Sequence, residues 1–211
     1  VDCHDILLMD NGHYLMMAYD PQLVDMSQVV PGGDTNATVT GLIIQEVDLD
    51  QNVYFQWRSW DHFQITDAVD NIDLTEPQID YAHGNAFDFD ENGDIMISSR
   101  HMDEITKIDY ETGDIIWRWG LSAKNNQFTF VNDTIGFSHQ HDIRMLDNGQ
   151  LTIYDNGNEH EPEPFSQAVV YSLNEETMEC TLEWNYRNQP EDVFFFATGS
   201  HRKLENGNHL I

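Results

Sequence analysis

Basic residues are scarce in this chain of 211 residues: nine are Lys or Arg against 38 Asp or Glu, and the formal net charge is −29. Binding to nucleic acid or to an anionic membrane requires a basic face. The composition therefore argues against both partners. An acidic surface of this kind favours solubility in a salty or extracellular medium, and its carboxylates are also potential calcium ligands. Self-association into a homo-oligomer stays open.

Cysteine and long apolar runs are scarce as well. Cys3 and Cys180 are too few and too far apart to define a disulfide framework, although a bond between them stays open. No window approaches the roughly 20 apolar residues of a membrane span. The chain opens on the strand-like run VDCHDILLM and closes on NGNHLI, so we expect a piece of a longer protein, with any export signal outside it.

The most regular stretch of the chain is 81–120. Asp90-Glu91-Asn92-Gly93 and Glu111-Thr112-Gly113 are turn signals, and the segments around them alternate in the manner of strands. The expected strands are 83–89, 94–101, 104–110 and 114–119. Four antiparallel strands in about forty residues are typical of one blade of a β-propeller. We therefore predict an all-β fold, a β-propeller of four-stranded antiparallel blades.

The rest of the chain repeats this unit, which predicts part of a single propeller domain with three to four blades in view. Polar segments at 21–38, 61–80 and 121–136 are expected to be connections, the second with one helical turn. The expected blades are about 1–60, 81–120 and 138–187, followed by the start of a fourth at about 197–211.

Three histidines occupy the same position in the repeat. His4 and His141 stand equally far before the Asn of an Asn-Gly turn, and His83 precedes the slightly longer turn of the central blade. The first strand of each propeller blade lines the central channel, so these side chains should meet at one mouth of it. A structural role would explain any one of them, but three at one repeat position favour a site.

Arg100 should join the histidines, because pairing across the Asn92-Gly93 turn places it nearly opposite His83. A partly desolvated arginine needs an anion, which could be a substrate or a neighbouring carboxylate. Asn85, two residues after His83, should face the same side of its strand. His139 should likewise share a side with His141.

Two alternatives involve metals. Three imidazoles also suit zinc, copper or iron, although a nearby arginine opposes a cation, and we therefore predict no metal at the histidines. Asp88, Asp90, Asn92 and Asp94 alternate around a turn in the manner of a structural calcium loop. Ordinary hairpin chemistry explains the same four residues.

The tryptophans offer a further alternative, a sugar-binding surface. Large aromatic side chains also fill the space between stacked sheets, and we expect that role here. The residues concerned are Trp57, Trp60, Trp117 and Trp119.

The order of these motifs resembles a known family, the bacterial arylsulfate sulfotransferases. The similar segments are HDILLMDNG at 4–12, HGNAFDFDENGDIMISSRHMDEITKIDYETGDIIWRWG at 83–120 and QHDIRMLDNGQLTIYDNG at 140–157, with a weaker match at NGN 206–208. The resemblance implies a six-bladed propeller exported to the periplasm or beyond the cell. It also implies transfer of a sulfuryl group from an aryl sulfate to a phenol, through a sulfated histidine and without a cofactor.

The resemblance also assigns roles to residues. The nucleophile falls on His141, with His139 as a rival, and Thr198 is a loose candidate for a substrate contact. The residues implied to bind the sulfuryl oxygens are His4, His83, Asn85 and Arg100. The competing hypothesis is a non-catalytic extracellular propeller that binds a partner, a glycan or calcium.

Overall fold

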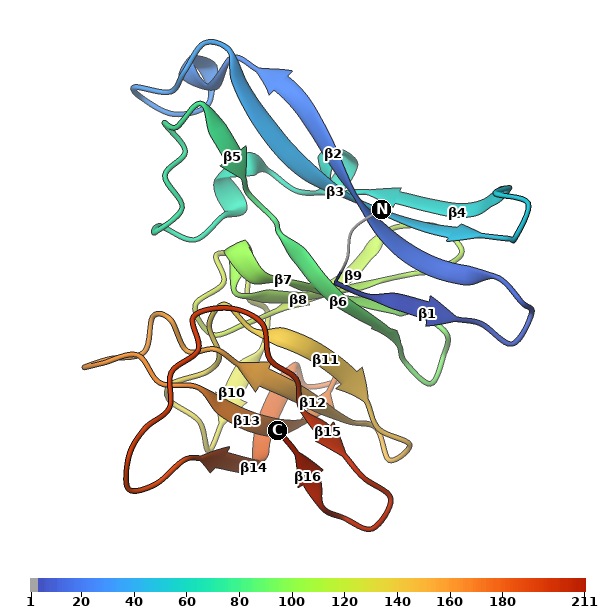
Figure 1. The fold of residues 1–211 in the computed structure, drawn as a ribbon, viewed down its shortest axis with the longest axis vertical. Helices are drawn as coiled ribbons and strands as arrows, with labels where there is room; N and C mark the ends of the chain where they lie inside the picture. Colours follow the sequence, from blue (N-terminus) through green and yellow to red (C-terminus); the bar gives the residue numbers. More distant parts are fainter. Residues whose placement is uncertain (1–3) are drawn as a thin grey trace.

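Three β-sheets follow one another along the chain in the computed structural model, which describes residues 4–211 (Figure 1). The first sheet has the order β1-β2-β3-β4, with β5 paired to β3 in parallel beyond the end of β4. Its strands are β1 Ile6–Leu8, β2 Tyr14–Val24, β3 Ala37–Val47, β4 Val53–Arg58 and β5 Gln78–Asp80. Short helical turns lie in its connections: η1 Met26–Gln28, α1 Ser59–His62 and η2 Ile65–Asp67.

The second sheet is the predicted four-stranded antiparallel unit, in the order β6-β7-β8-β9. Aspartate and asparagine side chains close its hairpins, since Asp90 Oδ1 accepts the backbone N–H groups of Asn92 and Asp94. Gly93 follows with a φ of +88°, the left-handed conformation that such a turn requires. The elements are β6 Gly84–Phe89, β7 Ile95–Ser99, η3 Arg100–Met102, β8 Glu104–Ile108 and β9 Ile115–Trp119.

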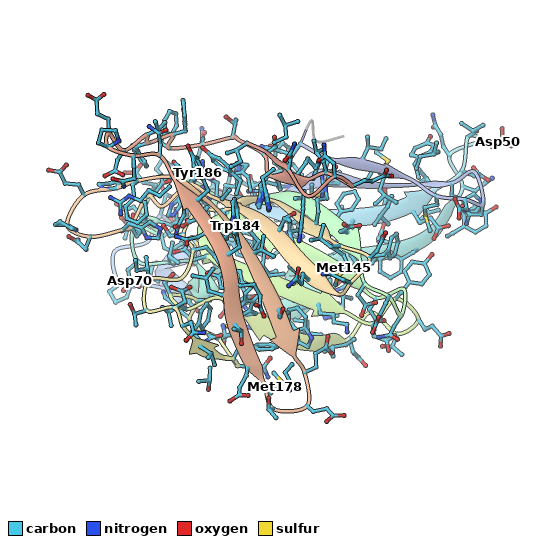
Figure 2. The ribbon with its side chains drawn as sticks, turned by 90° about the horizontal axis from the view of Figure 1, so that it is seen from below. Asp50, Asp70, Met145, Met178, Trp184 and Tyr186 are labelled. Carbon is cyan, nitrogen blue, oxygen red and sulfur yellow. The ribbon has the colours of Figure 1, made fainter. Side chains whose placement is uncertain are left out.

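The third sheet has the order β10-β14-β13-β12-β11, and a two-stranded hairpin follows it. β10 joins its edge in parallel to β14. The strands are β10 Thr129–Val131, β11 His141–Met145, β12 Gln150–Asp155, β13 Gln167–Asn174 and β14 Glu179–Arg187, with β15 Arg202–Lys203 and β16 His209–Leu210 in the hairpin. Figure 2 shows Trp184 on β14, with Met178 in the turn before it.

The chain is therefore all-β, as predicted, and mainly antiparallel. Within residues 4–211 the sheets form no closed barrel or ring. No helix in the described part of the chain is both long and apolar enough to cross a membrane. Figure 2 places Asp50 and Asp70 at the periphery, in loops that carry part of the acidic surplus.

All three expected connections contain strand residues, since β5 lies within 61–80 and β10 within 121–136. The segment 21–38 was predicted to be a loop, but β2 continues to Val24 and β3 begins at Ala37. Pro21 is tolerated in this strand because the described part of β1 pairs with β2 only through residues 14–16, so no described strand needs an N–H of Pro21 on that edge. The polar segment thus includes strand ends as well as a turn.

Two hydrophobic cores lie between successive sheets. Ile95 and Ile97 of β7 enter the core shared with the first sheet, whereas Met96 enters the core shared with the third sheet. This alternation buries both faces of the second sheet. Trp57, Trp117 and Trp119 are buried in these cores, and Trp60 packs against the first one. The tryptophans therefore have the predicted packing role.

Of the two cysteines, the structure describes only Cys180. Cys180 is buried in the second of these cores and forms no disulfide with another described residue. Cys3 lies outside the described residues, so a pairing between the two stays a prediction.

Truncating Trp119 tests this packing. Its indole is fully buried and contacts the rings of Phe128, Phe130, Phe137 and Tyr171. Trp119→Ala should lower the free energy of unfolding by about 3–5 kcal/mol, because it removes this contact area and leaves a cavity. Ile116→Ala on the same strand is the control, since Ile116 is 41% exposed and its loss should change the free energy by about 0.5 kcal/mol or less. Denaturant titration measures both, and equal effects would contradict the proposed packing.

Candidate active site

Five imidazoles form a continuous group where the first, second and third sheets meet. Their ring centroids are separated by 6.3 Å from His141 to His4, 5.3 Å from His4 to His83, 4.6 Å from His83 to His101 and 6.2 Å from His101 to His139. We call these five residues the histidine cluster. The structure therefore brings His4, His83 and His141 together, as the repeat predicted.

The order of the strands explains why members of the histidine cluster lie close together. His83 directly precedes β6 and His141 opens β11, and these two strands lie next to each other. Left-handed backbone conformations are frequent here: φ is +49° at His83, +53° at His139 and +63° at Thr198. Such conformations cost of order 1–3 kcal/mol each in non-glycine residues and gather at functional sites.

His141 is held in one tautomer. Its Nδ1 lies 2.7 Å from Asn156 Oδ1, which can only accept a hydrogen bond, so Nδ1 carries the proton. Its Nε2 lies 3.3 Å from the backbone N–H of Thr198 and accepts from it. The Nε2 lone pair therefore belongs to a neutral ring. Asn156 also donates through Nδ2 to the carbonyl oxygens of Phe195 and Thr198, which fixes this loop against the histidine.

Burial keeps this ring neutral. It lowers the pKa of His141 to about 4, and the positive charges of Arg100 and His4 act in the same direction, against the hydrogen bond to Asn156. At neutral pH the side chain is an uncharged imidazole with an available lone pair on Nε2, which is the state that a nucleophile needs.

Arg100 lies beside the histidine cluster, and one of its side-chain N–H donors has no partner among residues 4–211. Its backbone N–H donates to the carbonyl of His83, which confirms the predicted pairing across the hairpin. Nη2 donates to the carbonyl of Phe196 at 2.7 Å, whereas Nε is buried without a partner. Within residues 4–211 no carboxylate pairs with this guanidinium. Burial lowers the pKa of Arg100, but arginine stays charged at any ordinary pH. The side chain is an anion-binding group whose anion is not supplied by the described chain.

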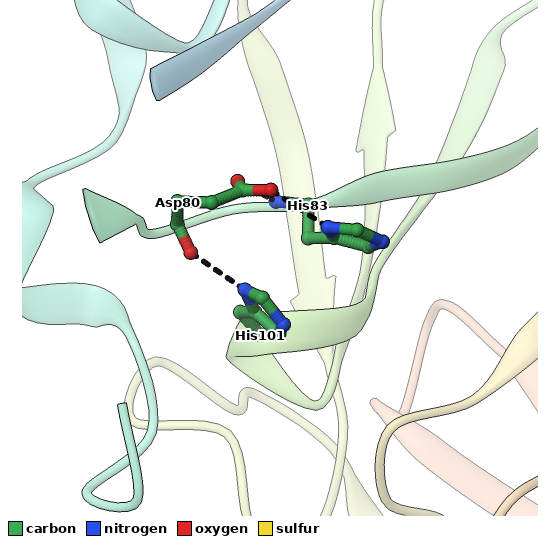
Figure 3. A group of neighbouring side chains, drawn as sticks. All are labelled: Asp80, His83 and His101. Atoms are coloured by element: carbon green, nitrogen blue, oxygen red, sulfur yellow. Dashed lines mark hydrogen bonds and ion pairs between the residues drawn. The ribbon is translucent and has the colours of Figure 1, made fainter. Parts of the chain in front are cut away.

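Asp80 orients two members of the cluster. Its carboxylate lies 2.7 Å from His83 Nδ1, and its backbone carbonyl accepts from His101 Nδ1 at 2.6 Å (Figure 3). Burial, followed by the charge of His83, lowers the pKa of His101 to about 4, so that ring is neutral.

His139 and Asn85 have structural contacts. His139 Nδ1 is 3.2 Å from Asp103, and Nε2 is 3.2 Å from the amide of Asn71. Its ring therefore has partners distinct from those of His141, although the sequence placed both on one side. Asn85 lies at an irregularity in the β6–β7 pairing and is 4% exposed. Its Nδ2 donates to the carbonyl of Gln140, so it anchors the residue before His141.

Thr198 lies next to His141, as the contact with Nε2 requires. A cavity of about 470 Å³ adjoins this threonine and is also lined by Tyr154, Phe195 and Gly199, but not by the histidine cluster.

The aspartates that follow two of the histidines take no part in the cluster. Arg144 Nη1 lies 2.8 Å from Asp5, and Nη2 lies 3.1 Å from Asp142. Asp142 also contacts Arg202 at 2.7 Å. The pair with Asp5 links β11 to the segment before β1, and the pair with Arg202 links β11 to β15. In each His-Asp pair of the sequence, therefore, the histidine belongs to the cluster and the aspartate has a structural role.

The residues considered for a calcium loop have other partners in the structure. Asp90 accepts backbone N–H groups of its turn and lies 2.7 Å from Lys107 Nζ, which also faces Asp94 at 3.9 Å. Asp88 accepts the N–H groups of Phe89 and Met145. Hairpin chemistry and the buried ammonium account for these contacts, and calcium binding stays a prediction.

Comparison with known proteins identifies the family of the chain. The family model for arylsulfotransferase (ASST) matches residues 2–211. The chain belongs to the arylsulfotransferase family. The match covers nearly the whole chain, so all of the motifs above fall within it. The resemblance of the sequence to the arylsulfate sulfotransferases is thereby confirmed.

Among solved structures, the arylsulfotransferase chain is similar to a protein of unknown function from Bacteroides caccae. The two share 14% identity with a TM-score of 0.49, and the alignment covers 96% of this chain and 52% of the other. The chain thus spans about half the length of that protein. No curated protein matches it.

Three residues of this candidate site were not predicted from the sequence. They are Asp80, His101 and Asn156. A signal existed for Asp80, which stands three residues before His83 and accepts its backbone N–H. His101 follows Arg100 directly, but η3 replaces the expected end of the strand and turns the ring toward His83.

The protonation of His141 predicts a pH dependence for chemistry at this site. The lone pair on Nε2 is lost as pH falls through about 4, so the rate of a reaction in which this nitrogen is the nucleophile should fall below that value and be level toward neutrality. Asn156→Asp places a carboxylate against Nδ1, which should raise the pKa of His141 by about 1–3 and move the acid limb upward. Asn174→Asp, in a distant turn, should leave the limb in place. A pH profile of the three proteins tests this, and an unmoved limb in Asn156→Asp would assign the titration to another group.

Proposed function

We propose that this protein transfers a sulfuryl group from an aryl sulfate to a phenol through a sulfated intermediate on His141. The observation that carries the proposal is the fixed state of His141. Asn156 holds its Nδ1 proton, burial keeps the ring neutral, and Nε2 faces the loop that carries Thr198. A neutral imidazole with a directed lone pair is a competent nucleophile.

In the first step the lone pair of His141 Nε2 attacks sulfur. The N–S bond forms, the bond from sulfur to the aryl oxygen breaks, and the bonding electrons leave with the phenolate. The hydrogen bond from Thr198 to Nε2 is given up in this step. The leaving oxygen takes a proton from a neighbouring imidazole, for which His4 and His83 are the nearest candidates.

The second step reverses the first with a new phenol. The acceptor hydroxyl gives its proton back to the neighbouring imidazole while its oxygen attacks sulfur, and the N–S bond breaks to release neutral His141. No nucleotide or metal cofactor takes part in either step. The same groups therefore serve both half-reactions, which is the requirement of a ping-pong mechanism.

Arg100 supplies the main electrostatic contribution. A sulfate monoester carries its charge on three terminal oxygens, and Arg100 has a buried Nε without a partner beside the nucleophile. A charge-assisted donor in a desolvated site stabilises such oxygens as the reaction proceeds. His4 and His83 complete the proposed sulfuryl pocket. In this structure Asn85 supports the backbone at Gln140, and we assign it to positioning of His141.

We further propose that the sheets are blades of a six-bladed propeller in a protein of the periplasm or the extracellular space. Support comes from the four-stranded second sheet, the packing of its faces on both neighbours, and the meeting of histidines from the start of successive first strands. The full reading frame, with its blade number and any export signal, tests this part.

An acceptor-dependent assay tests the activity. The intact protein is incubated with 4-nitrophenyl sulfate, with and without a second phenol, in the absence of any nucleotide. We expect release of 4-nitrophenol that depends on the acceptor, with the sulfated acceptor formed in equal amount. Release without the acceptor would indicate a hydrolase. If no phenol is released, the protein is a non-catalytic propeller that binds a partner, a glycan or calcium.

A further inference from the structure

The strongest unassigned feature of the chain is the group formed by Asp80, His83 and His101. One possible ligand atom from each residue lies within 4.8 Å of the others. Figure 3 shows the two imidazoles on the same side of Asp80, with their outer nitrogens directed the same way. Asp80 orients His83 and His101, and neither Asp80 nor His101 takes part in the proposed transfer.

The hydrogen bonds determine which nitrogens are available. The backbone carbonyl of Asp80 can only accept, so His101 Nδ1 carries a proton. The Asp80 carboxylate accepts from His83 Nδ1 in the same way. Among residues 4–211 neither Nε2 has a hydrogen-bond partner. Both rings thus present an Nε2 lone pair whenever they are neutral, and one residue orients both.

This is the arrangement of metal-binding histidines in proteins. A histidine ligand usually donates its second nitrogen to a carboxylate or a backbone carbonyl, which fixes the tautomer and raises the basicity of the ligand. Asp80 supplies one partner of each kind. Imidazole nitrogens select zinc or copper, whereas calcium and magnesium prefer oxygen.

We propose that His83 and His101 bind one divalent zinc or copper ion through their Nε2 atoms, with Asp80 orienting both ligands. The ring centroids are 4.6 Å apart, and metal binding brings both Nε2 atoms to metal–nitrogen distances of about 2.0–2.1 Å. The His4 ring, 5.3 Å from that of His83, is the next imidazole within reach, and water completes the coordination.

The positive charge of Arg100 opposes binding of a cation here, but nearby carboxylates offset that charge. Asp80 is part of the site, and the charges of Asp80 and Asp103 both act on the Arg100 guanidinium. Asp103 is buried on the far side of the cluster, where it contacts His139. The two carboxylates balance Arg100 and leave the metal with two neutral ligands.

The inference has a consequence for the activity, and this consequence rests on the proposed function. A metal on His83 removes that side chain from the sulfuryl pocket, so the ion should compete with the aryl sulfate. The metal-bound protein would be inhibited, and a chelator should restore its activity. Protein prepared free of metal should be active without a chelator.

Binding is tested without reference to activity. Zinc chloride is titrated into the metal-free intact protein by calorimetry, at a salt concentration that weakens binding to surface carboxylates. We expect one tight site per chain. His101→Phe should weaken it by about 100-fold or more, and Asp80→Asn by about 10–100-fold, the usual effect of losing the partner of a metal ligand. His62→Phe is the matched control, because that ring stacks on Trp57 and an aromatic replacement keeps the contact.

A second measurement does not depend on variants. Copper(II) bound to the unaltered protein should show electron paramagnetic resonance couplings to imidazole nitrogens, and His101→Phe should remove one of them. The proposal is overturned if the unaltered protein has no tight zinc site, if His101→Phe binds zinc as tightly as His62→Phe does, or if copper shows no nitrogen coupling. Activity with aryl sulfate but no zinc site would reject the metal site alone, whereas a zinc site without any transfer activity would reject only the proposed function.

Discussion

His141→Asn in the intact protein should lower sulfuryl transfer from an aryl sulfate to a phenol by about 10⁴-fold or more, a loss seen when covalent enzymes lose their nucleophile. Asparagine has no ring nitrogen that can attack sulfur, so the N–S bond cannot form. The side chain is similar in size, and binding of the aryl sulfate should persist. A kinetic comparison should therefore show the loss in kcat, with little change in the dissociation constant of the donor.

His139→Asn is the matched control for this substitution. Its ring contacts Asp103 and Asn71 and has no role in the proposed transfer. We expect a lower melting temperature and a milder loss of activity. Full loss in His139→Asn together with surviving activity in His141→Asn would move the nucleophile to His139.

Arg100→Leu should lower kcat/KM by about 10²–10³-fold, the usual effect of losing one charge-assisted donor at an oxyanion. The isobutyl group fills part of the space, but it cannot bind the sulfuryl oxygens, and the hydrogen bond to the Phe196 carbonyl is lost as well. Arg100→Lys should recover part of the activity, because the charge is kept while the planar set of donors is lost.

Arg58→Leu provides the comparison for Arg100. Arg58 forms an ion pair with Asp20 at 2.6 Å on the first sheet, away from the histidine cluster. Partly exposed pairs of this kind contribute little to stability, so the variant should fold and its activity should be unchanged. If the two leucine variants retained equal activity, Arg100 would have no part in sulfuryl binding.

The strand pattern was largely predictable from local sequence. β6 to β9 lie within one or two residues of the bounds predicted for the stretch 81–120 at nearly every end, because turn residues separate these strands. β5 and β10 were not predicted. Each is only three residues long and pairs in parallel with a distant strand, so neither has a local hairpin signal.

The site was predictable in position but not in detail. The repeat placed His4, His83 and His141 together, since equivalent positions of successive sheets converge. The contacts of His139 and Asn85 could not be predicted from strand alternation. Left-handed conformations at His139 and Asp142 and an irregular pairing at Asn85 redirect these side chains, and single-sequence periodicity does not show such features.

The hydrogen-bond partners of His141 and Arg100 were also not predictable from the sequence. Asn156 fixes the tautomer of His141 from the end of β12, and no motif in the sequence connects the two. The loop at 195–198 reaches the site through backbone groups alone, which any residue type could supply. Only the folded chain shows that these groups surround one imidazole.

Detection of a sulfuryl group on His141 is the most decisive test of the proposed mechanism. The intact protein is mixed with an aryl sulfate in the absence of a phenol acceptor, digested at neutral to alkaline pH, and analysed by mass spectrometry with fragmentation of the peptide that contains His139 and His141. The account predicts one added sulfuryl group on His141, which disappears when phenol is added before digestion. A protein that transfers the sulfuryl group while this peptide stays unlabelled, or that carries the label on another residue, would contradict it.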